Sequence, residues 1–201
     1  MVERELHPPH SVEDGRCFFL TASTVGHSQL LGEGHRVIVR DQARRIAEKH
    51  HLTVSAWVVL ADHYHLLIHA APGAEVPRFI QRFHAATALR VNGLDGRRGR
   101  KVWYQYWDTT VASEDAFWAC MNYIHINPLK HGLVRWRDPG AGDVHQSAMA
   151  GLQASDVSAN ELLAGYAWSS YAYYLRTYGE EFLADLWRRY PVPRHMLGDA
   201  G

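Results

Sequence analysis

Two strand-forming runs separated by only two residues constrain the fold more than any other feature of this chain. Residues 53–60 and 63–70 are rich in Val, Leu, Ile, Trp and Tyr, and Ala61 and Asp62 form the whole connection between them. A connection of two residues can join antiparallel strands but not parallel ones. The two runs therefore predict a β-hairpin.

Further strand and helix patterns lie on both sides of this hairpin. The expected strands are residues 17–22 and 102–111, and apolar residues recur at helical spacing in residues 37–50, 75–92 and from Glu114 towards Pro128. Ser113 is the expected N-cap of the last helix. The order β-α-β-β-α-β-α predicts an α+β, ferredoxin-like sandwich, in which helices pack on one face of an antiparallel sheet.

Composition divides the chain into four segments. The expected segments are an irregular leader (1–16), the main α+β domain (17–137), a mobile excursion or linker rich in Gly, Ala, Ser and Asp with one short helix near 159–163 (138–165), and a helical tail packed on the main domain (166–201). With 201 residues and 47% hydrophobic composition, the chain is long enough to bury one core.

Several protein classes are disfavoured. No run approaches the roughly 18 apolar residues of a membrane helix, and the first residues lack the pattern of a signal peptide, so a cytoplasmic, non-membrane protein is expected. Two cysteines, Cys17 and Cys120, are too few for a disulfide framework or a Cys-x-x-Cys metal site.

Positive charge is concentrated although the total charge is balanced. The chain has 21 basic and 21 acidic residues, yet residues 78–101 hold seven Arg or Lys side chains against Asp95 alone. Such a run is either a solvated loop or a phosphate-binding surface. Its densest part is Arg97, Arg98, Arg100 and Lys101.

Two histidines at the start of the second hairpin strand are candidate metal ligands. His63 and His65 alternate along a strand, so their side chains share one face about 6.6 Å apart at ~3.3 Å per residue. With 14 histidines in the chain, one His-x-His pair is also expected by chance. His69 is about 13 Å further along the same face at ~3.3 Å per residue, too far for the same ion, and is read as structural.

A second group of polar residues lies on the last predicted helix. Tyr123 and Asn127 are four residues apart and share a helix face. The Asn127 amide oxygen can complete a metal site begun by two histidines, while the Tyr123 phenol can attack a phosphate. The opposing reading is that Tyr123 packs in the core and that Pro128 turns Asn127 away from it.

Together these motifs resemble one known family. Residues 57–68, 102–107, 123–134 and 167–171 are similar, in the same order, to the REP-associated tyrosine transposases, relatives of the single-strand insertion-sequence transposases. Two departures are Ala61, where the family often has proline, and the long 138–165 stretch.

The resemblance implies an HUH fold and a mechanism. His63 and His65 would bind Mg²⁺ or Mn²⁺ with Asn127 as third ligand, and Tyr123 would attack a DNA phosphate to give a 5′-phosphotyrosine and a free 3′-hydroxyl. The implied partner is single-stranded DNA with a hairpin from a repetitive extragenic palindrome. The basic residues Arg97, Arg98, Arg100, Lys101 and Lys130 are expected DNA contacts.

Three other functions stay open at this point. The chain could be a hairpin-binding regulator with little turnover, a metal nuclease that uses water in place of Tyr123, or a structural domain. The preferred metal is open, as is the choice between monomer and homodimer, with the tyrosine acting in its own chain or in a partner.

Overall fold

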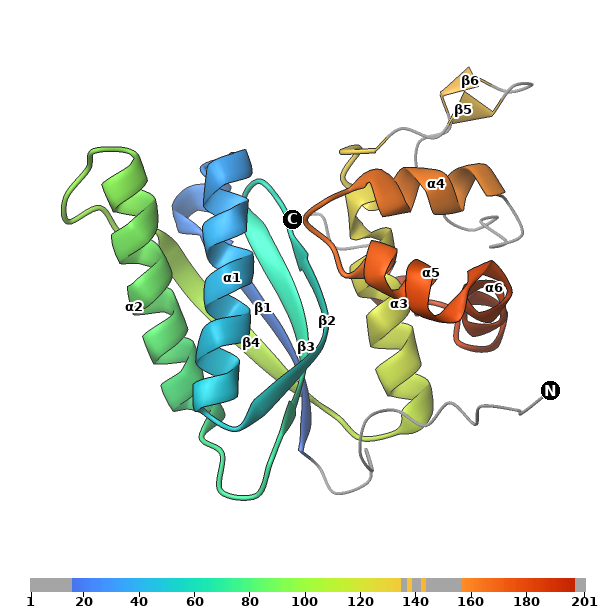
Figure 1. Ribbon diagram of the computed structural model, residues 1–201, viewed down its shortest axis with the longest axis horizontal. Coiled ribbons are helices and arrows are strands. Elements are labelled where there is room, and N and C mark those ends of the chain that lie inside the picture. The colour runs from blue at the N-terminus through green and yellow to red at the C-terminus, as the bar shows by residue number, and fades with distance from the viewer. Residues whose placement is uncertain (1–15, 135–136, 139–141, 144–156, 198–201) are drawn as a thin grey trace.

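A four-stranded antiparallel sheet forms the centre of the molecule (Figure 1). The computed structural model describes residues 16–134, 137–138, 142–143 and 157–197. The strands lie in the order β2-β3-β1-β4. Their bounds are β1 (Cys17–Thr24), β2 (Leu52–Val59), β3 (His63–Ala70) and β4 (Trp103–Val111). The predicted hairpin is confirmed as β2 and β3, and the Leu60 N–H donates to the His63 carbonyl at 2.8 Å across the turn.

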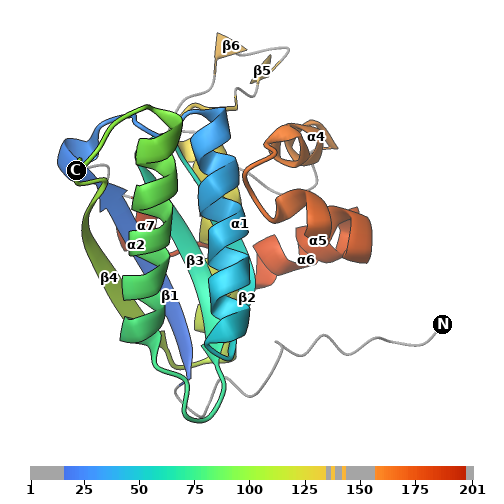
Figure 2. The same ribbon diagram turned by 60° about the vertical axis from the view of Figure 1, so that its left-hand side comes forward.

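The two faces of the sheet are covered by different helices. Helices α1 (Glu33–Lys49) and α2 (Val76–Leu94) lie side by side on one face, which is called the helical face below (Figure 2). Helix α3 (Glu114–Lys130) lies on the other face, over β2 and β3. The α+β sandwich with α1 and α2 on one face is as predicted.

Helix α1 begins at Glu33, four residues before its predicted start at residue 37, and its first turn contains a glycine. Gly34 is in the first turn of α1, where it approaches the end of α2. A Cβ atom at this position would lie 3.1 Å from Cδ2 of Leu94. The glycine is thus a position of close helix contact rather than a helix terminator.

Helix α3 begins as predicted and continues past its proline. The Ser113 hydroxyl accepts a hydrogen bond from the Ala116 N–H at 3.1 Å, which caps the helix, and Glu114 and Asp115 lie in the first turn, where the helix dipole favours acids. Pro128 interrupts the backbone hydrogen bonding, but the helix reaches Lys130 before it ends.

The C-terminal part extends the sheet and then packs against α3. The Val59 N–H donates to the Trp168 carbonyl at 2.8 Å and the Ser170 N–H to the Trp57 carbonyl at 2.9 Å, so residues 168–170 line the β2 edge. The remaining elements are η2 (Val25–His27), β5 (Arg137–Asp138), β6 (Gly142–Asp143), α4 (Val157–Gly165), α5 (Tyr171–Tyr178), α6 (Glu180–Arg189) and α7 (Arg194–Leu197).

Some predictions fall outside the described residues. These are the irregular leader and most of the 138–165 excursion, of which α4 is the predicted short helix. None of the helices within the described ranges is long and apolar enough to cross a membrane.

Candidate active site

Alternation along β3 separates structural residues from candidate catalytic ones. Tyr64 and Leu66 are buried between the sheet and α1 and α2, whereas His63 and His65 face α3. The two imidazole rings have centroids 5.0 Å apart. The face that carries them is called the catalytic face below.

His65 is held in position by a threonine from the neighbouring strand. Its Nδ1 lies 2.7 Å from Oγ1 of Thr21, which is its register partner on β1. Its Nε2 is buried and has no hydrogen-bond partner among the described residues. Burial above all, and then the nearby His63, lower the pKa of His65 well below its usual range, so the ring is neutral and Nε2 keeps a lone pair.

His63 is oriented by the carboxylate that precedes it. Its Nδ1 lies 2.7 Å from Oδ1 of Asp62. Burial by itself would raise the pKa of Asp62, but the hydrogen bond and the charge of His63 outweigh it and the pKa is lowered. A carboxylate that holds Nδ1 of a histidine leaves Nε2 available to a metal, as is common for metal-binding histidines.

Asn127 remains on the face of Tyr123 despite the following proline. Its Nδ2 donates to the Tyr123 carbonyl at 2.8 Å, and because a carbonyl can only accept, this bond fixes which end of the amide is which. The other end, Oδ1, is buried without a partner within the described part of the chain. The Asn127 amide lies close to His65 and acts to raise the pKa of His65, against the larger effect of burial. Its Oδ1 atom does not, however, form a hydrogen bond with the imidazole.

Tyr123 lies between the histidines and a lysine. Its ring is 5.2 Å from that of His65 and 5.9 Å from that of Phe19, both edge-on. Nζ of Lys130 donates to the Tyr123 hydroxyl at 3.2 Å and lies 5.0 Å from its ring centroid. Lys130, predicted to contact DNA, therefore contacts the candidate nucleophile, and it also donates to the Met196 carbonyl in α7 at 3.0 Å.

The donor set fits a divalent metal that has few protein ligands. Two imidazole nitrogens and one amide oxygen converge, and two of these three atoms are buried without a partner, which is costly unless a further group satisfies them. No group of three His, Cys, Asp or Glu side chains suited to a metal occurs in the described residues. Any metal here would therefore depend on the Asn127 oxygen and on ligands from outside the protein.

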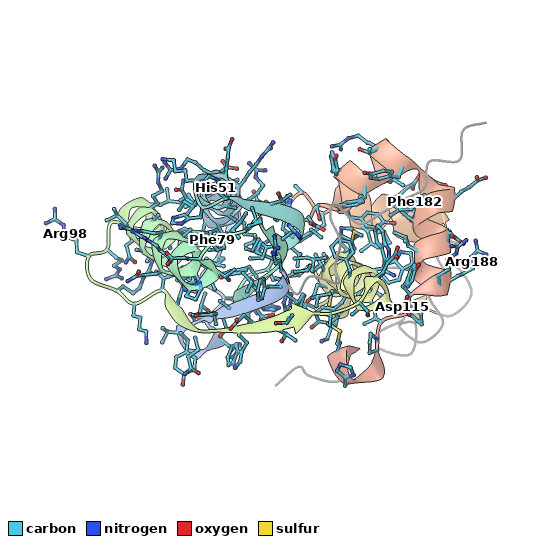
Figure 3. The ribbon with its side chains drawn as sticks, turned by 90° about the horizontal axis from the view of Figure 1, so that it is seen from below. His51, Phe79, Arg98, Asp115, Phe182 and Arg188 are labelled. Carbon is cyan, nitrogen blue, oxygen red and sulfur yellow. The ribbon has the colours of Figure 1, made fainter. Side chains whose placement is uncertain are left out.

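The predicted basic residues other than Lys130 lie in the loop between α2 and β4. Arg97 and Arg98 are exposed, and Figure 3 shows Arg98 far from Asp115 at the start of α3. Arg100 is occupied by an ion pair with Asp95 and a hydrogen bond to Asn92. The loop nevertheless lies at the same end of the sheet as His63. At the end of β1, the Thr24 N–H donates to the carbonyl of Asp62, which precedes His63, and the Val25 N–H donates to the carbonyl of Val102, which follows the loop.

The family of the chain follows from a match to a family model described as "Transposase IS200 like", over residues 23–127. The match covers more than half of the chain and includes His63, His65, Tyr123 and Asn127. The chain belongs to the IS200-like transposase family. The family assignment makes it a DNA nicking and joining enzyme.

One solved structure supports the fold of this family. A structure described as "Structure of the REP associates tyrosine transposase bound to a REP hairpin" is similar with a TM-score of 0.58 and 16% identity, covering 86% of each chain, which shows a shared fold. A protein from Deinococcus radiodurans R1, provisionally described as a transposase, is 27% identical over 54% of this chain and 87% of its own, with a TM-score of 0.43. No curated protein matches the chain.

Several residues of the site were missed in the sequence. Thr21, Asp62 and Phe19 hold or contact the predicted residues, and His131 lies with its ring 4.8 Å from that of His63. Burial, and then the nearby His63, lower the pKa of His131 to about 4. Only Asp62, directly before the His-x-His pair, could have been found from the sequence. Thr21 and Phe19 lie about 44 residues from His65 in the sequence and reach it only through the pairing of β1 with β3.

Proposed function

We propose that this transposase cleaves and rejoins single-stranded DNA at hairpin-forming repetitive palindromes through a covalent bond to Tyr123. The observation that carries the proposal is the convergence of the Tyr123 phenol with two buried, unpartnered ligand atoms, Nε2 of His65 and Oδ1 of Asn127. The related fold bound to a REP hairpin supports the substrate class.

His63, His65 and Asn127 would hold Mg²⁺ or Mn²⁺, and the bound ion would polarise the scissile phosphate and stabilise the charge of the transition state. Asp62 and Thr21 fix the two imidazoles through their Nδ1 atoms, which directs both Nε2 atoms inward. The same two contacts keep the rings from rotating when the phosphate arrives.

Tyr123 is the proposed nucleophile and Lys130 its positioning residue. The phenolic oxygen forms a bond to phosphorus, the bond from phosphorus to the 3′-oxygen breaks, and the 3′-oxygen leaves with a proton as a free hydroxyl. The phenolic proton is released to solvent. The Lys130 ammonium, already donating to the phenol, stabilises the phenolate that attacks and that leaves again on rejoining.

The proposed reaction predicts a covalent protein–DNA band on a denaturing gel. Protein, Mn²⁺ and end-labelled hairpin oligonucleotides with unpaired flanks should give this band, and Tyr123→Phe should abolish it. Tyr104→Phe is the matched control, because Tyr104 is exposed on β4 and should leave the band unchanged. Cleavage without a band, retained in Tyr123→Phe, would establish a nuclease that uses water, and binding without cleavage would establish a regulator.

The site is also proposed to be complete within one chain. The rings of Tyr123 and His65 are 5.2 Å apart in the same chain. A mixture of His63→Ala and Tyr123→Phe proteins should therefore form no covalent band. Recovery of activity on mixing would show that the tyrosine acts on a partner's histidines.

A further inference from the structure

The catalytic face of the sheet is only half covered by α3. Helix α3 lies over β2 and β3, whereas Tyr104 to Thr110 of β4 are exposed throughout. One residue of this strand is a tryptophan with 52% of its surface exposed, Trp107. About half of its largely apolar indole ring is therefore accessible to a ligand.

A bulge in β4 decides which face Trp107 occupies. Between Ala22 and Thr24 of β1, the partner on β4 changes from Tyr106 to Trp103, so β4 has one extra residue there. Because of this extra residue, side chains of β4 on the two sides of the bulge that would otherwise point to opposite faces point to the same face. Trp103 and Tyr106 consequently both face α2, where each ring contacts His84.

Trp107 therefore faces the opposite way, in one row with the proposed metal ligand. Thr21 of β1 pairs with Trp107 on one side and with His65 on the other. Side chains of directly paired residues share a face, so His65, Thr21 and Trp107 follow one another across the catalytic face, with backbones about 4.8 Å apart from strand to strand.

Phe19 continues the same surface towards the nucleophile. It pairs with Thr109, which makes it a diagonal neighbour of Trp107 at about 7–8 Å. The Phe19 ring stacks on that of His65 with centroids 5.3 Å apart and meets Tyr123 edge-on. The strand register thus places Trp107 on the same face as the aromatic rings of the active site, one strand away from Phe19.

Positive charge leads into the same strand. Arg97, Arg98 and Lys101 precede β4 in the loop that lies at the His63 end of the sheet. A cationic loop followed by an exposed aromatic ring is the combination by which proteins hold single-stranded nucleic acid, the cations contacting phosphates and the ring stacking on a base.

We infer that Trp107 is a base-stacking residue that holds a nucleotide next to the scissile phosphate on the open half of the catalytic face. The inference rests on the proposed function, which places that phosphate between His65 and Tyr123. Stacking tolerates every base, so Trp107 sets the path of the strand rather than its sequence.

Binding of 2-aminopurine DNA tests the inference separately from cleavage. Tyr123→Phe protein is saturated with hairpin oligonucleotides that carry 2-aminopurine at each unpaired flanking position in turn. Stacking on Trp107 should quench the fluorescence at one position. Trp107→Ala should remove this quenching and weaken binding roughly five- to 100-fold, while Trp107→Phe should retain most of both.

Tyr106→Ala is the matched control, because the neighbouring aromatic residue lies on the helical face. It should leave the quenching unchanged. Absence of quenching at every position, or equal quenching in Trp107→Ala, would overturn the assignment. Failure of the proposed function would have a different sign, namely that the wild-type protein forms no covalent band. The fluorescence measurement is independent of that result, because it uses the Tyr123→Phe protein and measures binding without cleavage.

Discussion

The two faces of the central sheet are built from the same strands, but they satisfy their polar atoms differently. On the helical face, Tyr64 and His84 bond to each other at 2.8 Å and the Trp103 indole N–H donates to Thr87 at 2.8 Å. On the catalytic face, Nε2 of His65 and Oδ1 of Asn127 are buried within the described structure without a partner. The polar groups named on the first face satisfy one another, whereas the two atoms on the second face would be satisfied by a ligand.

The unsatisfied polar atoms of the catalytic face lower the stability of the folded protein, but they leave ligand atoms available for binding. An unsatisfied buried polar atom costs about 1–3 kcal/mol, which the closed core on the helical face can offset. Because the residues of β3 alternate, substitutions at adjacent positions should separate stability from chemistry. The predictions below test this separation.

The largest expected effect is the loss of cleavage in His63→Ala. Removal of one ligand should reduce metal-dependent cleavage by roughly 100-fold or more, since a bound metal contributes several kcal/mol to the transition state. Leu66→Ala, on the helical face of the same strand, should instead lower the free energy of unfolding by about 2–5 kcal/mol and leave the chemical step of the folded protein intact. Single-turnover cleavage and urea unfolding measure the two effects.

A thermal melt with Mn²⁺ provides a readout other than cleavage. A metal that binds only the folded protein raises its melting temperature. Wild-type and Leu66→Ala proteins should both show this increase, and His63→Ala should not. An equal increase in His63→Ala would contradict the metal assignment.

The next effect concerns Lys130, which the structure places on the catalytic face beside Tyr123. Lys130→Gln should slow formation of the covalent band about 10- to 100-fold, because a hydrogen bond to a charged group contributes about 1.5–3 kcal/mol. Hairpin affinity should change little, and Lys130→Arg should recover much of the rate. A loss of affinity equal to the loss of rate would make Lys130 a DNA contact instead.

Sequence reasoning predicted those features of the site that depend on local periodicity. The alternation of His63 and His65 and the four-residue spacing of Tyr123 and Asn127 are local, and in each pair the two residues share a face, as the spacing predicts. Their roles as metal ligands and nucleophile stay a proposal. The doubt over Pro128 was resolved by a tertiary effect, because α3 is packed on both sides and its helix persists.

The remaining features depend on contacts between distant segments. The hydrogen bond between Thr21 and His65 depends on the register of β1 against β3. The orientation of Trp107 depends on a bulge in β4 that no local sequence pattern predicts. The early start of α1 was missed for the same reason, since Gly34 in its first turn lies against Leu94 of another helix.

Acid should weaken the helical face through His84. Burial lowers the pKa of His84 from 6.5 to about 4, so the folded state binds fewer protons than the unfolded state between these values. Stability therefore rises with pH across this window and is lost as pH falls from about 6.5 towards 4. The contribution is about 1–2 kcal/mol once solvent screening of the partly buried ring is allowed for.

His84→Gln isolates this contribution, because glutamine can still accept from Tyr64 but does not titrate. Urea unfolding at pH 7.5 and pH 5 should show a smaller difference in the variant than in the wild type. The buried His125, whose pKa burial lowers to about 3, contributes with the same sign in both proteins. An unchanged difference would mean that His84 is not held neutral by its burial.

The smallest expected effect tests whether the position of Tyr123 depends on the helix start or on the packing of the helix. Ser113→Ala removes the cap of α3 and should cost about 1 kcal/mol of stability, whereas Ser113→Asp should keep the cap. Tyr123 lies more than two turns beyond the cap, and α3 is held there by its buried face on β2 and β3. The rate of covalent band formation at a temperature well below unfolding should therefore be the same in both variants. A slower rate in Ser113→Ala alone would show that the catalytic face depends on the helix end, and thus that stability and chemistry are less separable here than across the two faces of β3.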